Sequence, residues 1–312
     1  MLNKSDNNKI LKDSKVFTVI KKQPKNQREI RQKDCITILN KKAIVHEYEL
    51  GSRIDQEINI VKDREFTFDK IFSENDDNTE VYKYTISPLI NTILNKGTVT
   101  CFTYGQIWSG KISTMQSIQS CAIEDLLRES EKYDLYLNYF HLYKDKIFVD
   151  ILKNRNNLQI SQDQNKNMQV NSFETQKITT KEQFMDLINS ANEISKDQKL
   201  NDINFNSHRI CNIIIRKKDS DEECGKLTFV ILGSPNNNNL EIDKSLLNLK
   251  ICLKTLKRKR NYLNAPFRES KLTQVLKDNF VKDGNKVIFI GCVNWGHVVH
   301  DDTLNTMRFC EI

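Results

Sequence analysis

The feature that most constrains this fold is a glycine-rich turn at residues 105–111, which directly follows an apolar run at residues 99–104. The run, VTCFTY, predicts a buried strand, and the turn, GQIWSGK, has the spacing of a phosphate-binding loop, G-x-x-x-x-G-K-[ST]. The residues from Ser113 onward predict the helix whose first backbone amides would face a bound anion. One position departs from the pattern, because Ile112 stands where Ser or Thr is required.

Strands and helices alternate along the rest of the chain. Short apolar runs predict strands at residues 16–20, 35–39, 43–45, 65–68, 135–140, 146–152, 210–215, 227–232 and 286–293. Apolar residues at helical spacing predict helices at residues 81–94, 180–191, 245–257 and 302–309. The Asn- and Gln-rich stretch 154–171 predicts a surface hairpin, and the almost wholly apolar run 227–232 predicts a central strand. This order predicts an α/β fold with a central, mostly parallel sheet and helices on both faces.

The composition is that of a soluble globular protein. The 312 residues are 38% apolar and 29% charged, which is enough for one large core. Because no Pro-, Gly- or Ser-rich linker divides the chain, we expect a flexible leader at residues 1–14 and a single domain at residues 15–312. No apolar run is long enough to span a membrane, and no hydrophobic targeting segment follows Met1. The eight scattered cysteines form no C-x-x-C pair and predict buried, reduced thiols in the cytosol.

Positive charge is concentrated in one segment. The net charge of the chain is +7, and residues 251–282 alone contribute that much, with nine Lys or Arg side chains against Glu269 and Asp278. A concentrated basic patch implies an acidic partner, which is a nucleic acid, an anionic membrane or an acidic protein surface.

Five blocks, in order along residues 16–309, resemble the kinesin motor domain. They are FTFDKIF at 66–72, CFTYGQ at 101–106, IDKSLLNLK at 242–250, PFRESKLTQVL at 266–276 and TLNTMR at 303–308. Together they are far more specific than a phosphate loop alone. His46, Glu47 and the charged segment before Phe66 resemble the kinesin-13, microtubule-depolymerising branch. Arg53 and Asp55 stand where that branch carries a Lys-Val-Asp finger that contacts tubulin.

The resemblance implies an ATP site, which is altered here. The positions that keep the family's pattern, and that we expect to contact nucleotide, are Gly105, Gln106, Ser109, Gly110, Lys111, Pro24, Ser207 and Gly233. Trp108 stands where the family has Gly, so its indole is expected either to crowd the phosphates or to force another loop path. Ile112 replaces the hydroxyl that would ligate Mg²⁺. The base-side motif R-x-R-P is reduced to KKQP at residues 21–24.

Both switch motifs of the family are altered as well. The first, N-x-x-S-S-R-S-H, is NDINFNSH at residues 201–208, so the two serines fall at Asn204 and Phe205 and the arginine at Asn206. Ser207 and His208 persist and alone favour a structural role. The second, D-L-A-G-S-E, is ILGSP at residues 231–235, one residue shorter, with Ile231 and Pro235 in place of Asp and Glu.

These losses bear on catalysis because phosphoryl transfer depends on positioning and on charge stabilisation by metal and side chains. Removing one such group typically costs about 10²–10³ in rate. We therefore expect negligible ATPase activity and at most weak binding of ATP or ADP. We assign no catalytic residue and expect no Mg²⁺ site.

The opposite end of the domain keeps the family's microtubule-binding pattern. The residues expected to contact tubulin are Lys254, Lys257, Arg258, Lys259, Arg260, Arg268 and Lys271, together with Arg53 and Asp55. Contact with acidic tubulin tails is expected to weaken as salt rises. For residues 257–260, a solvated helix end or a nuclear-import signal is the alternative. His297 and His300 have no Cys or Glu at metal spacing and are expected to be loop histidines.

Three functions remain open on the sequence. The first, which we favour, is a nucleotide-uncoupled kinesin-like protein that binds microtubules passively or through a partner such as a second kinesin-like chain. The second is a working kinesin-13-type ATPase. The third is a degenerate paralogue that acts as a dimerisation or regulatory module. The favoured function predicts a place on cytoplasmic microtubules, with no nucleic-acid or membrane partner and no neck or tail within residues 1–312.

Overall fold

The computed structural model describes residues 14–25, 32–49, 59–143, 147–150, 155–158, 160–162, 168–170, 175–194, 207–220, 222–234, 240–258 and 265–312. Its centre is a sheet of ten described strands, nine of which follow one another in the order β5-β1-β15-β6-β14-β13-β7-β8-β9, while β12 pairs with β7. In that order the strands are Lys70–Phe72, Val16–Lys22, Lys286–Val293, Thr98–Tyr104, Glu223–Ile231, Ser207–Lys217, Tyr133–Tyr143, Ile147–Asp150 and Arg155–Leu158, with β12 at Gln176–Ile178.

The sheet has a parallel part and an antiparallel part. Strands β5, β1, β15, β6 and β14 run parallel, and the pairs from β14 outward through β13, β7, β8 and β9 run antiparallel. Strand β14 lies between β6 and β13, which confirms the predicted central strand. Thr103 of β6 and Arg209 of β13 both pair with Ile231 of β14. The loops after β6 and β14 therefore leave the same edge of the sheet, as ligand-binding loops of parallel sheets do.

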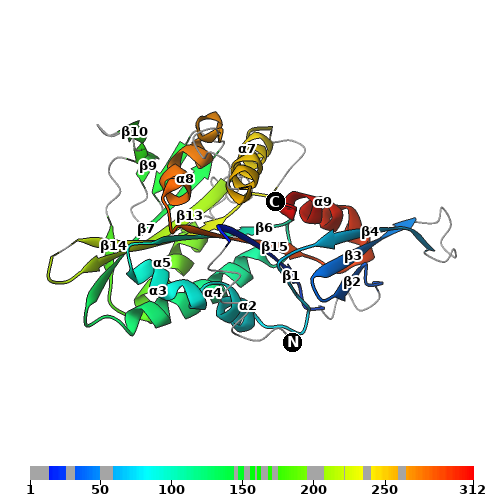
Figure 1. The fold of residues 1–312 in the computed structure, drawn as a ribbon, viewed down its shortest axis with the longest axis horizontal. Coiled ribbons are helices and arrows are strands. Elements are labelled where there is room, and N and C mark those ends of the chain that lie inside the picture. Colours follow the sequence, from blue (N-terminus) through cyan, green and yellow to red (C-terminus); the bar gives the residue numbers. More distant parts are fainter. Residues whose placement is uncertain are drawn as a thin grey trace.

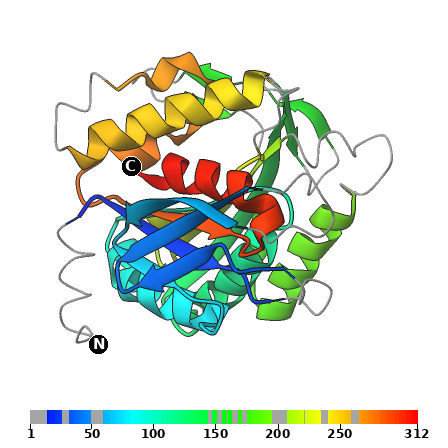
Figure 2. The same ribbon diagram turned by 90° about the vertical axis from the view of Figure 1, so that its right-hand side faces the viewer.

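Helices cover both faces of the sheet, which confirms the predicted class (Figures 1 and 2). One face is covered by α2 (Asn78–Thr85), α3 (Ile90–Leu94), α4 (Lys111–Leu127) and α5 (Lys181–Ile194). The other is covered by α7 (Leu240–Lys257), α8 (Lys271–Val281) and α9 (His300–Cys310). Each layer has its own apolar core: Ile118 and Phe184 are buried in the first, and Leu249 and Phe280 in the second.

A second, smaller sheet packs at the end of the molecule next to α9 (Figure 1). It consists of β2 (Ile36–Leu39), β3 (Lys42–Glu49) and β4 (Asn59–Thr67), all antiparallel. The predicted strand at residues 65–68 is thus the end of a nine-residue strand. The proposed tubulin finger with Arg53 and Asp55 lies outside the described residues, as does the predicted leader apart from Ser14, whose carbonyl accepts a hydrogen bond from Lys286 Nζ.

Two sequence predictions need correction, and one helix was missed. The predicted helix 81–94 is two helices, because Pro88, within a 3₁₀ turn at Ser87–Leu89, supplies no amide to continue α2. The predicted hairpin 154–171 is divided: β9 joins the main sheet, and only β10 (Ile160–Gln162) and β11 (Met168–Val170) pair as a hairpin. Helix α8, with Ser270 as its N-cap, was not predicted.

The cysteines agree with the sequence prediction. All eight are free, and all except the half-buried Cys121 are buried. No helix in the described ranges is both long and apolar enough to cross a membrane.

Candidate functional site

The turn between β6 and α4 has the backbone that a phosphate loop needs. A Cβ added to Gly105 would lie 2.2 Å from the carbonyl oxygen of Cys292, so only glycine fits there. Gly110 has φ = 81° and forms the N-cap of α4, a left-handed conformation that glycine adopts without strain. The predicted loop therefore has the strand–turn–helix context that its motif requires.

One of the two sequence expectations was that the indole of Trp108 crowds the phosphate position. The structure does not show this. The Trp108 side chain is 84% exposed at the mouth of the loop, so the indole is directed towards solvent. Its backbone has φ = 67°, the left-handed region, which costs a residue with a Cβ roughly 1–2 kcal/mol. The backbone of Trp108 is therefore strained, because it has a conformation that suits glycine.

A cavity of about 470 Å³ lies between this loop, the start of β13 and the segment that follows β14. Six of the predicted nucleotide contacts line it, namely Gln106, Ser109, Gly110, Lys111, Ser207 and Gly233. Gly105 lies behind the wall and contributes its carbonyl oxygen, which accepts a hydrogen bond from Lys111 Nζ at 2.9 Å. Pro24 is exposed and is not part of the lining, whereas its neighbour Gln23 is.

Two cationic side chains share the wall of this cavity. Lys111, the first residue of α4, also donates to Ser234 Oγ, and loss of water around its ammonium group lowers the pKa of Lys111 to about 8. The nearby charge of Arg209 contributes to this lowering of the pKa. Arg209 is only 8% exposed and shares a side-chain hydrogen bond with Tyr139.

Sequence reasoning missed Arg209. Ser207 and Arg209 are two residues apart on β13, so their side chains share the face that borders the cavity. The available signal was a cation at the beginning of a mostly apolar run, immediately after the Ser-His pair of the first switch.

The residues around the cavity do not fit a magnesium ion. Ile112 and Ile231 both line it, at the two positions where the resemblance implies a hydroxyl and a carboxylate. None of the described lining residues is an Asp or a Glu. Within the ranges that the structure covers, no group of three His, Cys, Asp or Glu side chains is placed to hold a metal. Mg²⁺ in proteins is usually held through one or two carboxylates, and the described wall offers only hydroxyl and amide oxygens. Asn204–Asn206 and Pro235 lie outside the described residues.

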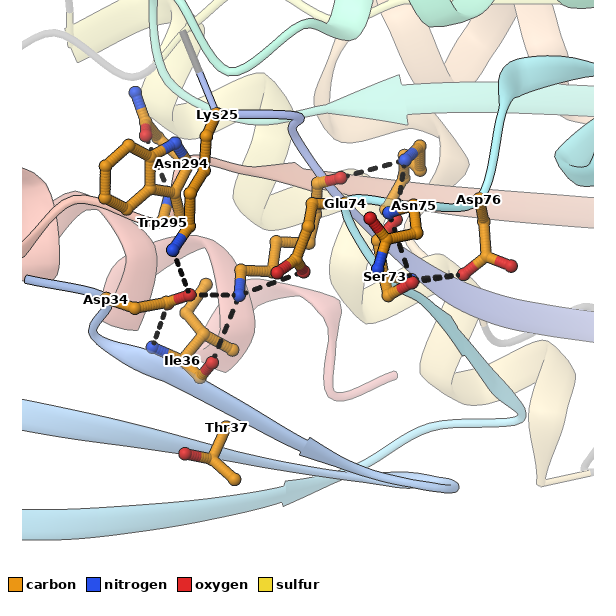
Figure 3. Close-up of polar contacts among 12 residues, drawn as sticks. Lys25, Asp34, Ile36, Thr37, Ser73, Glu74, Asn75, Asp76, Asn294 and Trp295 are labelled. Carbon is orange, nitrogen blue, oxygen red and sulfur yellow. Dashed lines mark hydrogen bonds and ion pairs between the residues drawn. The ribbon is translucent and has the colours of Figure 1, made fainter. Parts of the chain in front are cut away.

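On the base side, the lysines of KKQP are engaged within the protein, and Figure 3 labels their partners Asp34, Ser73 and Glu74. Lys21 Nζ donates to the carbonyl oxygens of Lys22 and Ser73, at 2.9 and 2.8 Å. Buried Lys22 forms ion pairs with Asp34 at 2.6 Å and Glu74 at 3.1 Å. These interactions hold both ammonium groups inside the fold, and weakened base contacts stay a prediction.

The neighbouring Lys25 takes part in the same network. Its Nζ lies 3.6 Å from Asp34 and 4.8 Å from the centroid of the Trp295 ring, so that Asp34 is placed between two lysines, as Figure 3 shows.

His208 connects the cavity to helix α7. Its Nδ1 accepts the amide hydrogen of Gly233 at 3.2 Å, and its Nε2 lies 2.7 Å from Ser245 Oγ. Because the Ser245 hydroxyl donates to the carbonyl of Ile242, Nε2 carries the proton. Burial, assisted by the charge of Lys111, lowers the pKa of His208 to about 3, so the ring is neutral. These contacts connect His208 to the fold on both sides of the ring, and its structural role stays a prediction.

The predicted tubulin contacts fall on two neighbouring elements. Lys254, Lys257 and Arg258 line a second cavity of about 600 Å³ beside residues 310–312, where Lys257 Nζ donates to the carbonyl of Ile312 at 2.8 Å. The exposed Arg268 lies in the turn before α8, and the half-buried Lys271 begins α8. Lys259 and Arg260 lie outside the described residues.

The outer face of α7 is partly apolar, which the sequence did not indicate. Leu246, Leu249, Leu253 and Leu256 are buried, as predicted. Leu247 and Ile251, one helical turn apart, are instead 57% and 41% exposed. The exposed residues of this helix therefore form a mixed basic and apolar surface.

Comparison with known proteins accounts for this arrangement. The sequence matches the family described as kinesin motor domain over residues 21–312. It is 30% identical over 340 aligned residues to "Kinesin-like protein KIN-13A" of Oryza sativa subsp. japonica. This alignment covers 96% of this chain and 41% of that protein. The chain thus spans less than half the length of this relative. A phosphate loop, a parallel sheet core and a family match along nearly all residues agree: the chain belongs to the kinesin motor-domain family, with a kinesin-13 relative matched along almost its whole length.

Proposed function

We propose that this domain binds microtubules through its basic face and hydrolyses ATP negligibly. The observation that carries the second part is the pair Ile112 and Ile231, which line the phosphate cavity where ligands for a metal are needed. Without a metal, the developing charge on a transferred phosphoryl group has lost its main stabilisation. The cradle formed by Gly110, Ser109 and Lys111 would still contact the phosphates of ATP or ADP.

The contacts of His208 support a passive mode of binding. Lys111 is bonded to Ser234, the adjacent Gly233 is bonded to His208, and His208 is bonded to Ser245 of α7. These bonds need neither metal nor γ-phosphate. We infer that they fix α7 near Ser245 independently of nucleotide, so that nucleotide state and microtubule contact are uncoupled.

Charge supports the choice of partner. Residues 251–282 carry the whole net charge of +7, and Arg258 and Arg268 are exposed there. A basic surface with apolar residues is suited to an acidic protein surface such as tubulin, and to a location on cytoplasmic microtubules. The match to the kinesin motor-domain family, and to a rice relative named as a kinesin-like protein, favours tubulin among acidic partners. That a second kinesin-like chain takes part stays a prediction.

Two assays test the proposal. In the first, steady-state ATP hydrolysis with Mg²⁺ should stay at background with and without microtubules, and microtubule-stimulated turnover would favour a working kinesin-13-type ATPase instead. In the second, the protein should co-sediment with microtubules at low salt and be released as salt rises. Arg258→Ala with Arg268→Ala should weaken co-sedimentation, whereas Lys218→Ala, an exposed lysine on the β13–β14 turn, should not. Protein that stays in the supernatant at low salt overturns microtubule binding.

A further inference from the structure

We propose that the cavity at the phosphate loop binds a polyphosphate anion without a divalent metal, with Lys111 and Arg209 as its two cations. This deepens the proposed function, and rests on it for the missing magnesium ligands. Arg209 becomes the second cation of the site, contributed by β13 instead of by the altered switch segment.

The first argument is charge. Lys111 and Arg209 come from different elements and border the same cavity, and none of the described lining residues carries a negative charge. The cost of this arrangement is visible in Lys111, whose pKa falls partly because Arg209 is near. Two like charges in a poorly solvated wall are stabilised when an anion enters between them.

The second argument is the set of neutral donors. Helix α4 is 17 residues long and begins at the cavity, with no side chain capping its first amides. Such amides attract anions. They open onto the cavity that the nearly buried Arg209 also lines, so an anion there would meet these amides and a cation together.

The third argument is that the wall offers poor ligands to a divalent metal. Ile112 and Ile231 would be the nearest neighbours of a metal bound to the anion, and neither can coordinate it or its water. A metal-bound polyphosphate also carries less negative charge for Lys111 and Arg209 to bind. Magnesium should therefore weaken binding here. The volume of about 470 Å³ is typical of small-molecule sites and exceeds what a single phosphate fills.

The test uses the full chain with inorganic pyrophosphate and ADP, each titrated in EDTA and in excess Mg²⁺. Calorimetry measures the affinity. The emission of Trp108 provides a local readout, because the other tryptophan, Trp295, is buried elsewhere and Trp108→Phe removes the signal. Binding in EDTA that is weakened severalfold by Mg²⁺ is expected, and Arg209→Met should reduce affinity about tenfold or more.

Matched variants keep the test decisive. Arg216→Met, on the same strand but distant from the cavity, should leave affinity unchanged, and Arg209→Lys should retain most of it. If Arg209→Met does not fold, the wild-type comparison of EDTA with Mg²⁺ still decides. No pyrophosphate binding in EDTA overturns this proposal alone and leaves the absence of ATPase activity standing. Tight binding that requires Mg²⁺ overturns it together with the missing metal site on which the proposed function rests.

Discussion

His208 Nε2 lies 2.7 Å from Ser245 Oγ, so a buried, neutral imidazole of β13 holds the beginning of α7 against the sheet. Its other nitrogen accepts the Gly233 amide. Both polar atoms of the ring are thus satisfied, and neither is available for proton transfer. A residue that belongs to the first switch in the family's sequence pattern is here a connection between the phosphate cavity and the helix of the basic face.

We predict that His208→Ala lowers the free energy of unfolding by about 2–4 kcal/mol at pH 7.5, because it leaves a cavity and two buried polar partners unpaired. The pKa of His208 is about 3 in the folded protein, below the ordinary value of 6.5. The unfolded chain therefore takes up this proton first, and the contribution of His208 is lost as pH falls from 6.5 towards 3. Urea unfolding of both proteins should show their difference reduced by about 2 kcal/mol at pH 5. An unchanged difference at the two pH values would contradict the neutral, buried ring.

A second prediction concerns the strained backbone at Trp108. Asn tolerates a positive φ better than other residues with a Cβ, so Trp108→Asn should raise the free energy of unfolding by roughly 0.5–1 kcal/mol. The matched variant Trp108→Val should lower it, because β-branched side chains are disfavoured most in this conformation. The indole is almost fully exposed, so little packing is lost in either case. Thermal melts of the three proteins measure the order, and equal stability of the Asn and Val variants would show that residue 108 is not held at positive φ.

Local patterns were enough to predict the loop, because glycine positions, a strand and a helix start are all encoded within about 20 residues. That isoleucines stand at residues 112 and 231, where the family's pattern has a hydroxyl and a carboxylate, was readable in the same way. The place of Arg209 at the cavity was not readable from the sequence, because it depends on strand register. Arg209 of β13 pairs with Ile231 of the adjacent strand β14, and this alignment brings it to the cavity. Lys22 was equally unreadable, because its partners Asp34 and Glu74 are distant in sequence.

A third prediction concerns the outer face of α7. Leu247→Ser with Ile251→Ser should weaken microtubule co-sedimentation about tenfold while leaving thermal stability nearly unchanged, because both side chains are already exposed. Burial of two such side chains against a partner contributes roughly 1–3 kcal/mol. Val298→Ser is the control, since Val298 is 63% exposed in the turn His297–Val299 and lines neither of the two cavities. If the double variant binds like wild type at every salt concentration, α7 does not contact the microtubule through this face.

The last prediction restores the metal ligands. In the variant Ile112→Thr with Ile231→Asp, a hydroxyl and a carboxylate would enter the cavity wall beside Lys111 and Arg209. The new carboxylate offsets part of the positive charge, so pyrophosphate binding in EDTA should weaken severalfold relative to wild type. The same oxygens can ligate Mg²⁺ or its water, so Mg²⁺ should strengthen ADP binding to this variant about tenfold. In the wild type we expect Mg²⁺ to weaken ADP binding. ATP turnover should stay at background because the altered residues of the first switch remain.

The control Ile112→Thr with Ile231→Asn supplies similar shape without the charge and should keep the wild-type response to Mg²⁺. If the charged and uncharged variants respond alike, the carboxylate position is not what separates this cavity from a magnesium-nucleotide site.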